Sequence, residues 1–175
     1  MNMQIPAIFL DRDGVINVDT GYPHKIEDCQ LIPGAAAAIR RARDEGYMIL
    51  VVTNQGGIAL GYYDEAALNR FNNHLAAQLA DQGAKLDAIT FCPHHPSSPD
   101  PSQRECSCRK PKPGMLLGLA REHNINMAAS AMIGDRITDI EAGEAAGVRA
   151  FLFEGGSLDT LMGKVLATMR EGQDG

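Results

Sequence analysis

Short apolar segments alternate with longer amphipathic segments along the chain, and the two kinds differ in their periodicity. Continuous apolar runs closed by turn residues predict buried strands. These runs lie at residues 5–10, 47–53, 87–91, 131–133 and 149–153. Apolar positions that recur every three or four residues predict helices. These segments lie at residues 34–45, 64–83, 113–123, 138–146 and 158–170.

Strands that alternate with helices favour a parallel sheet with helices on both faces. We expect an α/β fold, a Rossmann-like three-layer sandwich with a mainly parallel central sheet. A length of 175 residues suits a single domain, residues 1–175. Ligands of such sheets bind beyond the carboxyl ends of the strands. Asp11, Thr53 and Asp135 each lie at or just past the end of a predicted strand, so we expect the functional site there.

Two aspartates follow the first predicted strand in the segment Asp11-Arg12-Asp13-Gly14. On an extended strand end, side chains two positions apart point to the same side. One carboxylate could attack phosphorus and form an aspartyl phosphate, while the other moves the proton. Two carboxylates beside phosphate oxygens require a hard cation, so Mg²⁺ is expected. The same pattern also suits a helix cap or a turn with paired aspartate side chains.

Two further segments could bind the charge of a phosphoryl group. The hydroxyl of Thr53 and the main-chain amides around Asn54 could hold phosphoryl oxygens, although threonine is common at strand ends. Lys110 in the run Arg109-Lys110-Pro111-Lys112-Pro113 could neutralise the carboxylate and the phosphoryl group, which repel each other. A solvated basic loop explains that run equally well.

A third aspartate follows the fourth predicted strand in Gly134-Asp135-Arg136-Ile137-Thr138-Asp139. Asp135 could complete the Mg²⁺ site, and Asp139 could brace it from the first turn of the next helix. The alternative is an ordinary helix start, in which Asp139 only favours the helix dipole.

Three of the four cysteines cluster with two histidines in a proline-rich segment. The cluster consists of Cys92, His94, His95, Cys106 and Cys108. Three thiolates and one imidazole form a closed tetrahedral Zn²⁺ site, which leaves no position for a substrate. We therefore expect a structural zinc loop at about residues 92–108, with Cys92, His94, Cys106 and Cys108 as ligands and His95 as the second choice to His94. Three unrelated reduced cysteines are the alternative.

Charge and hydropathy restrict the partners of the chain. A formal net charge of -6 disfavours binding to a nucleic-acid backbone. The apolar runs are far shorter than the ~20 residues that span a membrane. The first residues lack a basic region and a cleavage pattern, so we expect no leader and a cytoplasmic protein. We also expect a monomer with no membrane and no nucleic-acid partner.

The four phosphate-related segments, in this order and each at a strand end, resemble the four-motif pattern of the haloacid dehalogenase superfamily of phosphotransferases. The resemblance extends from Phe9 to about Phe153. It implies a capless core in which Asp11 is the nucleophile and Asp13 is first general acid and then general base. It also implies Thr53 and Lys110 as phosphate stabilisers. The implied magnesium ligands are the carboxylates of Asp11 and Asp135 and the main-chain carbonyl of Asp13.

The zinc loop narrows the resemblance to small bacterial phosphatases of D-glycero-D-manno-heptose 1,7-bisphosphate and the related histidinol-phosphate phosphatases. The stretches that favour the heptose branch are residues 16–22 with His24, residues 53–59, and residues 108–111 with 113–116. This branch removes the C7 phosphate and leaves heptose 1-phosphate for the nucleotide-activated heptose of lipopolysaccharide. On this interpretation Arg109 binds the unreacted phosphate, and Asn54, Asp19 and Tyr22 contact the phosphorylated sugar. Leu60 stands where such sequences often have arginine, which leaves the preferred sugar anomer open.

Three other functions compete with the heptose hypothesis. A histidinol-phosphate phosphatase needs an acidic pocket for an amine, for which Asp19, Glu27 and Asp28 are few candidates. A DNA 3′-phosphatase shares the core motifs, but the negative charge and the absence of a basic aromatic stripe count against it. A non-catalytic phosphosugar-binding or interaction module has no use for an intact Asp11 and Asp13.

Overall fold

The central layer of the computed structural model is a five-stranded sheet, described here within residues 3–172. The strands are β1 (Ala7–Leu10), β2 (Met48–Asn54), β3 (Ala88–Cys92), β4 (Ala131–Gly134) and β5 (Arg149–Leu152). They follow the order β3-β2-β1-β4-β5, and every neighbouring pair is parallel. The expected α/β fold with a parallel sheet is confirmed, with strand limits that differ from the predicted ones by one or two residues.

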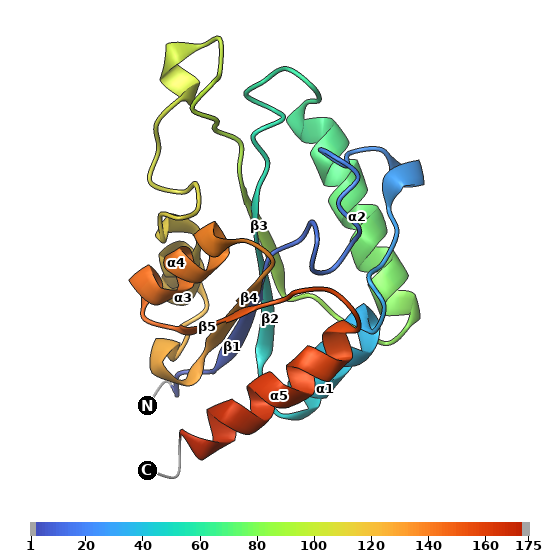
Figure 1. Cartoon of the computed structure of the whole chain (residues 1–175), viewed down its shortest axis with the longest axis vertical. Coiled ribbons are helices and arrows are strands. Elements are labelled where there is room, and N and C mark those ends of the chain that lie inside the picture. The colour runs from blue at the N-terminus through green and yellow to red at the C-terminus, as the bar shows by residue number, and fades with distance from the viewer. Residues whose placement is uncertain (1–2, 173–175) are drawn as a thin grey trace.

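Helices cover both faces of the sheet (Figure 1). The helices are α1 (Ala35–Asp44), α2 (Glu65–Asp81), α3 (Gly114–Glu122), α4 (Ile137–Ala146) and α5 (Leu158–Glu171). Short 3-10 helices lie at Ile26–Asp28, Pro101–Gln103 and Met127–Ala129. Helices α1, α2 and α5 pack on one face and α3 and α4 on the other, which completes the three-layer sandwich.

Alternate side chains of the central strands enter two separate apolar cores. In β1, Ile8 and Leu10 face the core under α1 and α5, whereas Ala7 and Phe9 face the core under α3 and α4. All four side chains are fully buried. Burying a side chain of the size of Leu10 stabilises the fold by about 1.5–3 kcal/mol. The two-sided burial explains why β1 is continuously apolar in sequence rather than alternating.

Local signals set the ends of the helices. The carboxylate of Asp64 accepts a hydrogen bond from the amide of Ala67 and caps α2, as its position before the apolar stripe predicts. Gly147 ends α4 with a positive φ of 85°, a conformation that suits glycine. Pro113 was expected as the first residue of its helix, but it is the N-cap, and α3 begins at Gly114.

The strand order places the ends of β1, β2 and β4 side by side at one edge of the sheet. Asp11 extends β1 by one further contact, because its amide donates to the carbonyl of Ile133 at 3.0 Å. Within residues 3–172, no helix is both long and apolar enough to cross a membrane.

Candidate active site

A cavity of about 540 Å³ opens at the carboxyl edge of the sheet. Most of the residues that the sequence nominated for phosphate chemistry line it. These are Asp11, Asp13, Asp19, Tyr22, Thr53, Asn54, Arg109 and Lys110. Because they come from the ends of β1 and β2 and from the loop after β3, the cavity depends on the parallel arrangement of the strands.

The ammonium of Lys110 joins two buried carboxylates at the base of this cavity. Its Nζ lies 2.9 Å from Oδ1 of Asp11 and 2.7 Å from Oδ1 of Asp139, and it donates to the carbonyl of Val52 at 2.7 Å. Burial raises the pKa of Asp11 to about 8, although the charge of Lys110 opposes this shift. Burial disfavours the charged form of Lys110, but Asp11 and Asp139 outweigh it and raise the pKa of Lys110.

Carboxylate oxygens of Asp11, Asp135 and Asp139 lie within 4.8 Å of one another and can hold a cation. Oδ1 of Asp135 is buried without a hydrogen-bond partner, and burial raises the pKa of this carboxyl. When all three carboxylates are ionised, one ammonium leaves two negative charges, which a divalent cation would balance. Oxygen donors alone are the preference of Mg²⁺, so this group fits it.

Asp139 braces the cation group rather than leaving its oxygens free. Its Oδ1 pairs with Lys110, and its Oδ2 accepts from the amides of Asp135 and Arg136, each at 3.1 Å. A side chain on Gly134 would collide with Asp139, so the close approach of the strand end requires glycine. The oxygens left available to a cation therefore belong to Asp11 and Asp135.

The carboxylate of Asp13 has partners different from those of Asp11. The chain bends at Arg12, so the two aspartates do not share one extended strand end, although both line the cavity. Oδ1 of Asp13 accepts from Nε of Arg12 at 2.8 Å and from Nδ2 of Asn17 at 2.9 Å. Oδ2 accepts from Nη2 of Arg12 and from Nε2 of Gln55, each at 3.1 Å. The sequence assigned no role to these three partners, because side-chain contacts of this kind leave no periodic signal.

Thr53 and Asn54 are consecutive residues at the end of β2, but their side chains make different contacts. Thr53 is buried against the cavity, and its Oγ1 accepts from Nε2 of Gln55 at 2.9 Å. Asn54 was nominated to bind substrate, yet its side chain pairs with the main chain of Lys110. Its Oδ1 accepts from the amide at 3.0 Å, and its Nδ2 donates to the carbonyl at 3.1 Å. Asn54 thus fixes the loop that delivers Lys110.

Charged and aromatic groups surround the mouth of the cavity. Asp19 pairs with the guanidinium of Arg136 at 3.1 Å. The ring of Tyr22 meets the ring of Tyr62 edge-on, with centroids 5.0 Å apart. Arg109 lines the cavity, and its Nη1 donates to the carbonyl of His94 at 3.0 Å.

The residue after His94 also reaches this mouth. His95 lines the cavity, and its Nδ1 accepts from the amide of Ser97 at 3.0 Å. Burial and the charge of Arg109 lower the pKa of His95. A neutral imidazole whose Nδ1 accepts carries its proton on Nε2, so His95 offers a donor. From the sequence we considered His95 only as the alternative to His94 as a zinc ligand.

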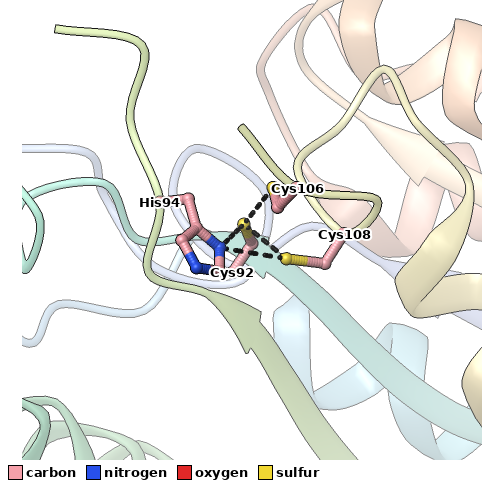
Figure 2. Close-up of side chains that lie close together, drawn as sticks. All are labelled: Cys92, His94, Cys106 and Cys108. Carbon is pink, nitrogen blue, oxygen red and sulfur yellow. Dashed lines mark hydrogen bonds between the residues drawn. The ribbon is translucent and has the colours of Figure 1, made fainter. Parts of the chain in front are cut away.

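A second cluster lies beside the cavity, where β3 meets the proline-rich loop. Figure 2 shows the sulfur atoms of Cys92, Cys106 and Cys108 and the Nδ1 of His94 gathered around one point. The sulfur of Cys92 lies 3.5 Å from Nδ1 of His94, 3.5 Å from the sulfur of Cys106 and 2.8 Å from that of Cys108. All three cysteines are free thiols. The four donor atoms lie within 4.8 Å of one another, which suits a tetrahedral metal site.

The two clusters are linked along the chain. The amide of Arg109 donates to the sulfur of Cys106 at 3.3 Å, and Lys110 follows directly. A metal held by the three sulfurs and His94 would therefore fix the position of the loop that places the ammonium of Lys110 next to Asp11.

Comparison with known proteins places this geometry in a family. The HAD-hydrolase-like family model matches residues 107–165. The D-glycero-beta-D-manno-heptose-1,7-bisphosphate 7-phosphatase of Yersinia pestis is 48% identical over 149 residues, which cover 85% of this chain and 79% of the relative. The enzyme of the same name from Escherichia coli K12 is 46% identical, covering 85% of this chain and 78% of the relative.

A solved structure extends the similarity to three dimensions. The D,D-heptose 1,7-bisphosphate phosphatase of B. bronchiseptica, solved with magnesium and phosphate, superposes with a TM-score of 0.81. It is 30% identical, and the match covers 94% of this chain and 99% of that one. Because the similarity in sequence and in structure covers most of both partners, the chain belongs to the family of D-glycero-beta-D-manno-heptose-1,7-bisphosphate 7-phosphatases, among the HAD-like hydrolases.

Proposed function

We propose that the protein removes the 7-phosphate of D-glycero-beta-D-manno-heptose 1,7-bisphosphate through an aspartyl phosphate on Asp11. One observation carries this proposal. The carboxylate of Asp11 lies at the tip of β1, where it pairs with Lys110 and is adjacent to the unpartnered oxygen of Asp135. The product, heptose 1-phosphate, would serve the synthesis of nucleotide-activated heptose for lipopolysaccharide.

The first half of the reaction transfers the phosphoryl group to the protein. An oxygen of Asp11 forms a bond to phosphorus while the bond from phosphorus to the C7 oxygen breaks. Asp13 gives its proton to that departing oxygen. Lys110 and Thr53, which both line the cavity, stabilise the charge on the phosphoryl oxygens.

The second half returns the protein to its starting state. Water attacks the phosphorus, Asp13 takes the water proton, and the electron pair of the breaking bond returns to Asp11. Asp11, Asp135 and the main-chain carbonyl of Asp13 would hold Mg²⁺. Bound there, Mg²⁺ supplies positive charge to the phosphoryl group throughout.

The charges at the mouth of the cavity favour a bisphosphate over an amine. Arg109, Arg136 and the neutral donor His95 face this part of the cavity, and the single acid there, Asp19, already pairs with Arg136. A second phosphate finds the guanidinium of Arg109 here, and that of Arg136 is shared with Asp19. The ammonium of histidinol phosphate finds no unpaired carboxylate, so this alternative is the weaker one.

We also propose that the second cluster binds Zn²⁺ through Cys92, His94, Cys106 and Cys108. Its set of sulfur and nitrogen donors is the one that zinc prefers, and all four positions belong to the protein. The metal would have a structural role. A cytoplasmic location, action as a monomer and a single domain over residues 1–175 stay predictions.

Release of phosphate in the presence of Mg²⁺ tests the function directly. Both anomers of heptose 1,7-bisphosphate are compared with histidinol phosphate, and the variant Asp11→Asn serves as the blank. We expect the β anomer to exceed histidinol phosphate by about a hundredfold or more in kcat/KM, since tenfold amounts to only about 1.4 kcal/mol. A preference for histidinol phosphate would leave the chemistry intact and refute the substrate.

A further inference from the structure

Arg12 is the largest fully buried side chain in the described structure, and it lies next to the active site rather than in it. A buried guanidinium is stable only when its donors are paired. Its Nε and Nη2 bind the two oxygens of Asp13, and Nη2 also donates to the carbonyl of Pro23 at 3.0 Å. The remaining nitrogen, Nη1, donates to Oδ1 of Asn72 at 2.8 Å.

The same guanidinium is held against helix α2. Its Cζ lies 4.3 Å from the centre of the Phe71 ring, a distance typical of a cation–π contact. Phe71 and Asn72 are consecutive buried residues of α2. No residue of α2 lines the active-site cavity. Arg12 therefore connects α2 to the carboxylate of Asp13.

Asp13 lies beyond the end of β1, after the bend at Arg12 and in an isolated bridge with Asn17, so local contacts set its position. The two hydrogen bonds from Arg12 form a planar fork that fixes both the place and the rotation of the carboxylate. Nδ2 of Asn17 and Nε2 of Gln55 add one hydrogen bond each, and these buried amides also donate to Val18 and Thr53. Arg12 is the partner that binds both oxygens of the carboxylate, and Asn72 holds the remaining nitrogen of its guanidinium.

We propose that Asn72 is a positioning residue for proton transfer, which acts through Arg12 to hold the carboxylate of Asp13 toward the leaving oxygen of the substrate. This inference rests on the proposed function, in which Asp13 protonates that oxygen. Asn72 itself touches neither substrate nor the reacting atoms. A displacement of about 1 Å at a reacting group can lower a rate by about a hundredfold, so the support has a kinetic effect.

The dependence of the rate on the leaving group distinguishes positioning from general support of the fold. Breaking the bond to a poor leaving group needs the proton of Asp13, whereas 4-nitrophenolate leaves with little help. The variants are Asn72→Ala, which removes the acceptor, and Asn72→Asp, which keeps an acceptor oxygen for Nη1. Asn73→Ala, at the exposed neighbouring position of α2, is the matched control. The substrates are heptose 1,7-bisphosphate, phenyl phosphate and 4-nitrophenyl phosphate, with kcat/KM measured because it covers the steps up to leaving-group departure.

We expect Asn72→Ala to lower kcat/KM about tenfold or more for the heptose substrate and phenyl phosphate, but less than about threefold for 4-nitrophenyl phosphate. Asn72→Asp should restore the wild-type pattern, and Asn73→Ala should retain it. An equal loss with all substrates, or no loss with the heptose substrate, would overturn the role of Asn72. Asn72→Leu, of similar shape, gives the same comparison if the alanine variant unfolds. If the wild-type enzyme does not prefer the heptose substrate, only the proposed function is refuted. The two aryl phosphates would still test how the effect of Asn72 depends on the leaving group.

Discussion

The ammonium of Lys110 lies 2.9 Å from the carboxylate of Asp11, although 99 positions separate the two residues in the chain. Replacement by Lys110→Met leaves Asp11 and Asp139 facing each other without a cation. We expect phosphate release to fall by about 10²–10³-fold, the usual effect of removing one group that stabilises transition-state charge. The free energy of unfolding should fall by about 3–5 kcal/mol, the usual cost of breaking a buried ion pair.

Urea denaturation and steady-state kinetics measure both effects of Lys110→Met. Lys112→Met is the control, because Lys112 is exposed and its Nζ only donates to the carbonyl of Cys106. Equal losses in the two variants would contradict a specific role for Lys110.

Asp11→Asn tests the covalent step. Asparagine has nearly the same shape, so we expect the far-ultraviolet circular dichroism to be unchanged and phosphate release to fall to the background. Mass spectrometry of acid-quenched wild-type protein should detect a phosphorylated species that the variant lacks. Substantial turnover by the variant would exclude Asp11 as the nucleophile.

The stability of magnesium-free protein should depend on pH through Asp11. Its pKa is about 8 in the folded protein, against about 3.9 in an unfolded chain. The folded state then binds more protons than the unfolded state, so the free energy of unfolding falls as the pH rises from about 4 to about 8.

Mg²⁺ should reverse this trend, because it binds the deprotonated carboxylates. Melting temperatures with and without saturating Mg²⁺ measure the effect, after dialysis without a chelator so that the Cys/His cluster is left intact. The difference in melting temperature with and without Mg²⁺ should increase as the pH rises. A difference that does not change with pH would argue against a cation at Asp11 and Asp135.

Cys106→Ala tests the structural metal. We expect the loss of one ligand to lower the zinc content and the free energy of unfolding, because the binding free energy of a structural zinc is folding free energy. At this chain length each kcal/mol lowers the melting temperature by about 2–4 °C. Activity should fall with it, because the amide of Arg109 contacts this sulfur. Cys29→Ala, outside the cluster, should retain zinc by elemental analysis, and an unchanged zinc content in Cys106→Ala would refute the site.

Arg109→Met tests recognition of the second phosphate. Charge-assisted hydrogen bonds contribute about 1.5–3 kcal/mol, so we expect KM for the bisphosphate to rise about tenfold or more. KM for a heptose 7-phosphate, which lacks the distal group, should change little. A parallel rise for both substrates would mean that Arg109 supports the loop rather than the phosphate.

The sequence predicted where the site lies better than how its side chains are joined. Buried strands and their ends follow from apolar runs, so the positions of Asp11, Thr53 and Asp135 at one edge of the sheet could be expected. Contacts across long separations carry no such periodicity. The pairing of Lys110 with Asp139 could not be predicted, nor could that of Asn54 with the main chain of Lys110.

The surroundings of Asp13 were the least predictable part of the site. The chain bends after Asp11, and no residue type there predicts the bend. The bend turns the carboxylate of Asp13 toward the guanidinium of Arg12. Arginine between two aspartates suggests an exposed position by its charge, yet this one is fully buried. Its burial depends on the acceptor of Asn72, which lies 60 positions later and reads in sequence as an ordinary polar residue of a helix.

The pairing of β1 with β4 also has a consequence for synthesis of the protein. Leu10 of β1 lies beside Ile133 of β4, so the two halves of the cation group meet only when most of the chain is available. A ribosome delivers Asp11 early and Asp135 late. The growing polypeptide therefore carries the proposed nucleophile through most of translation before the strand with its partner carboxylate has left the exit tunnel. On the proposed mechanism, hydrolysis begins only when folding is nearly complete.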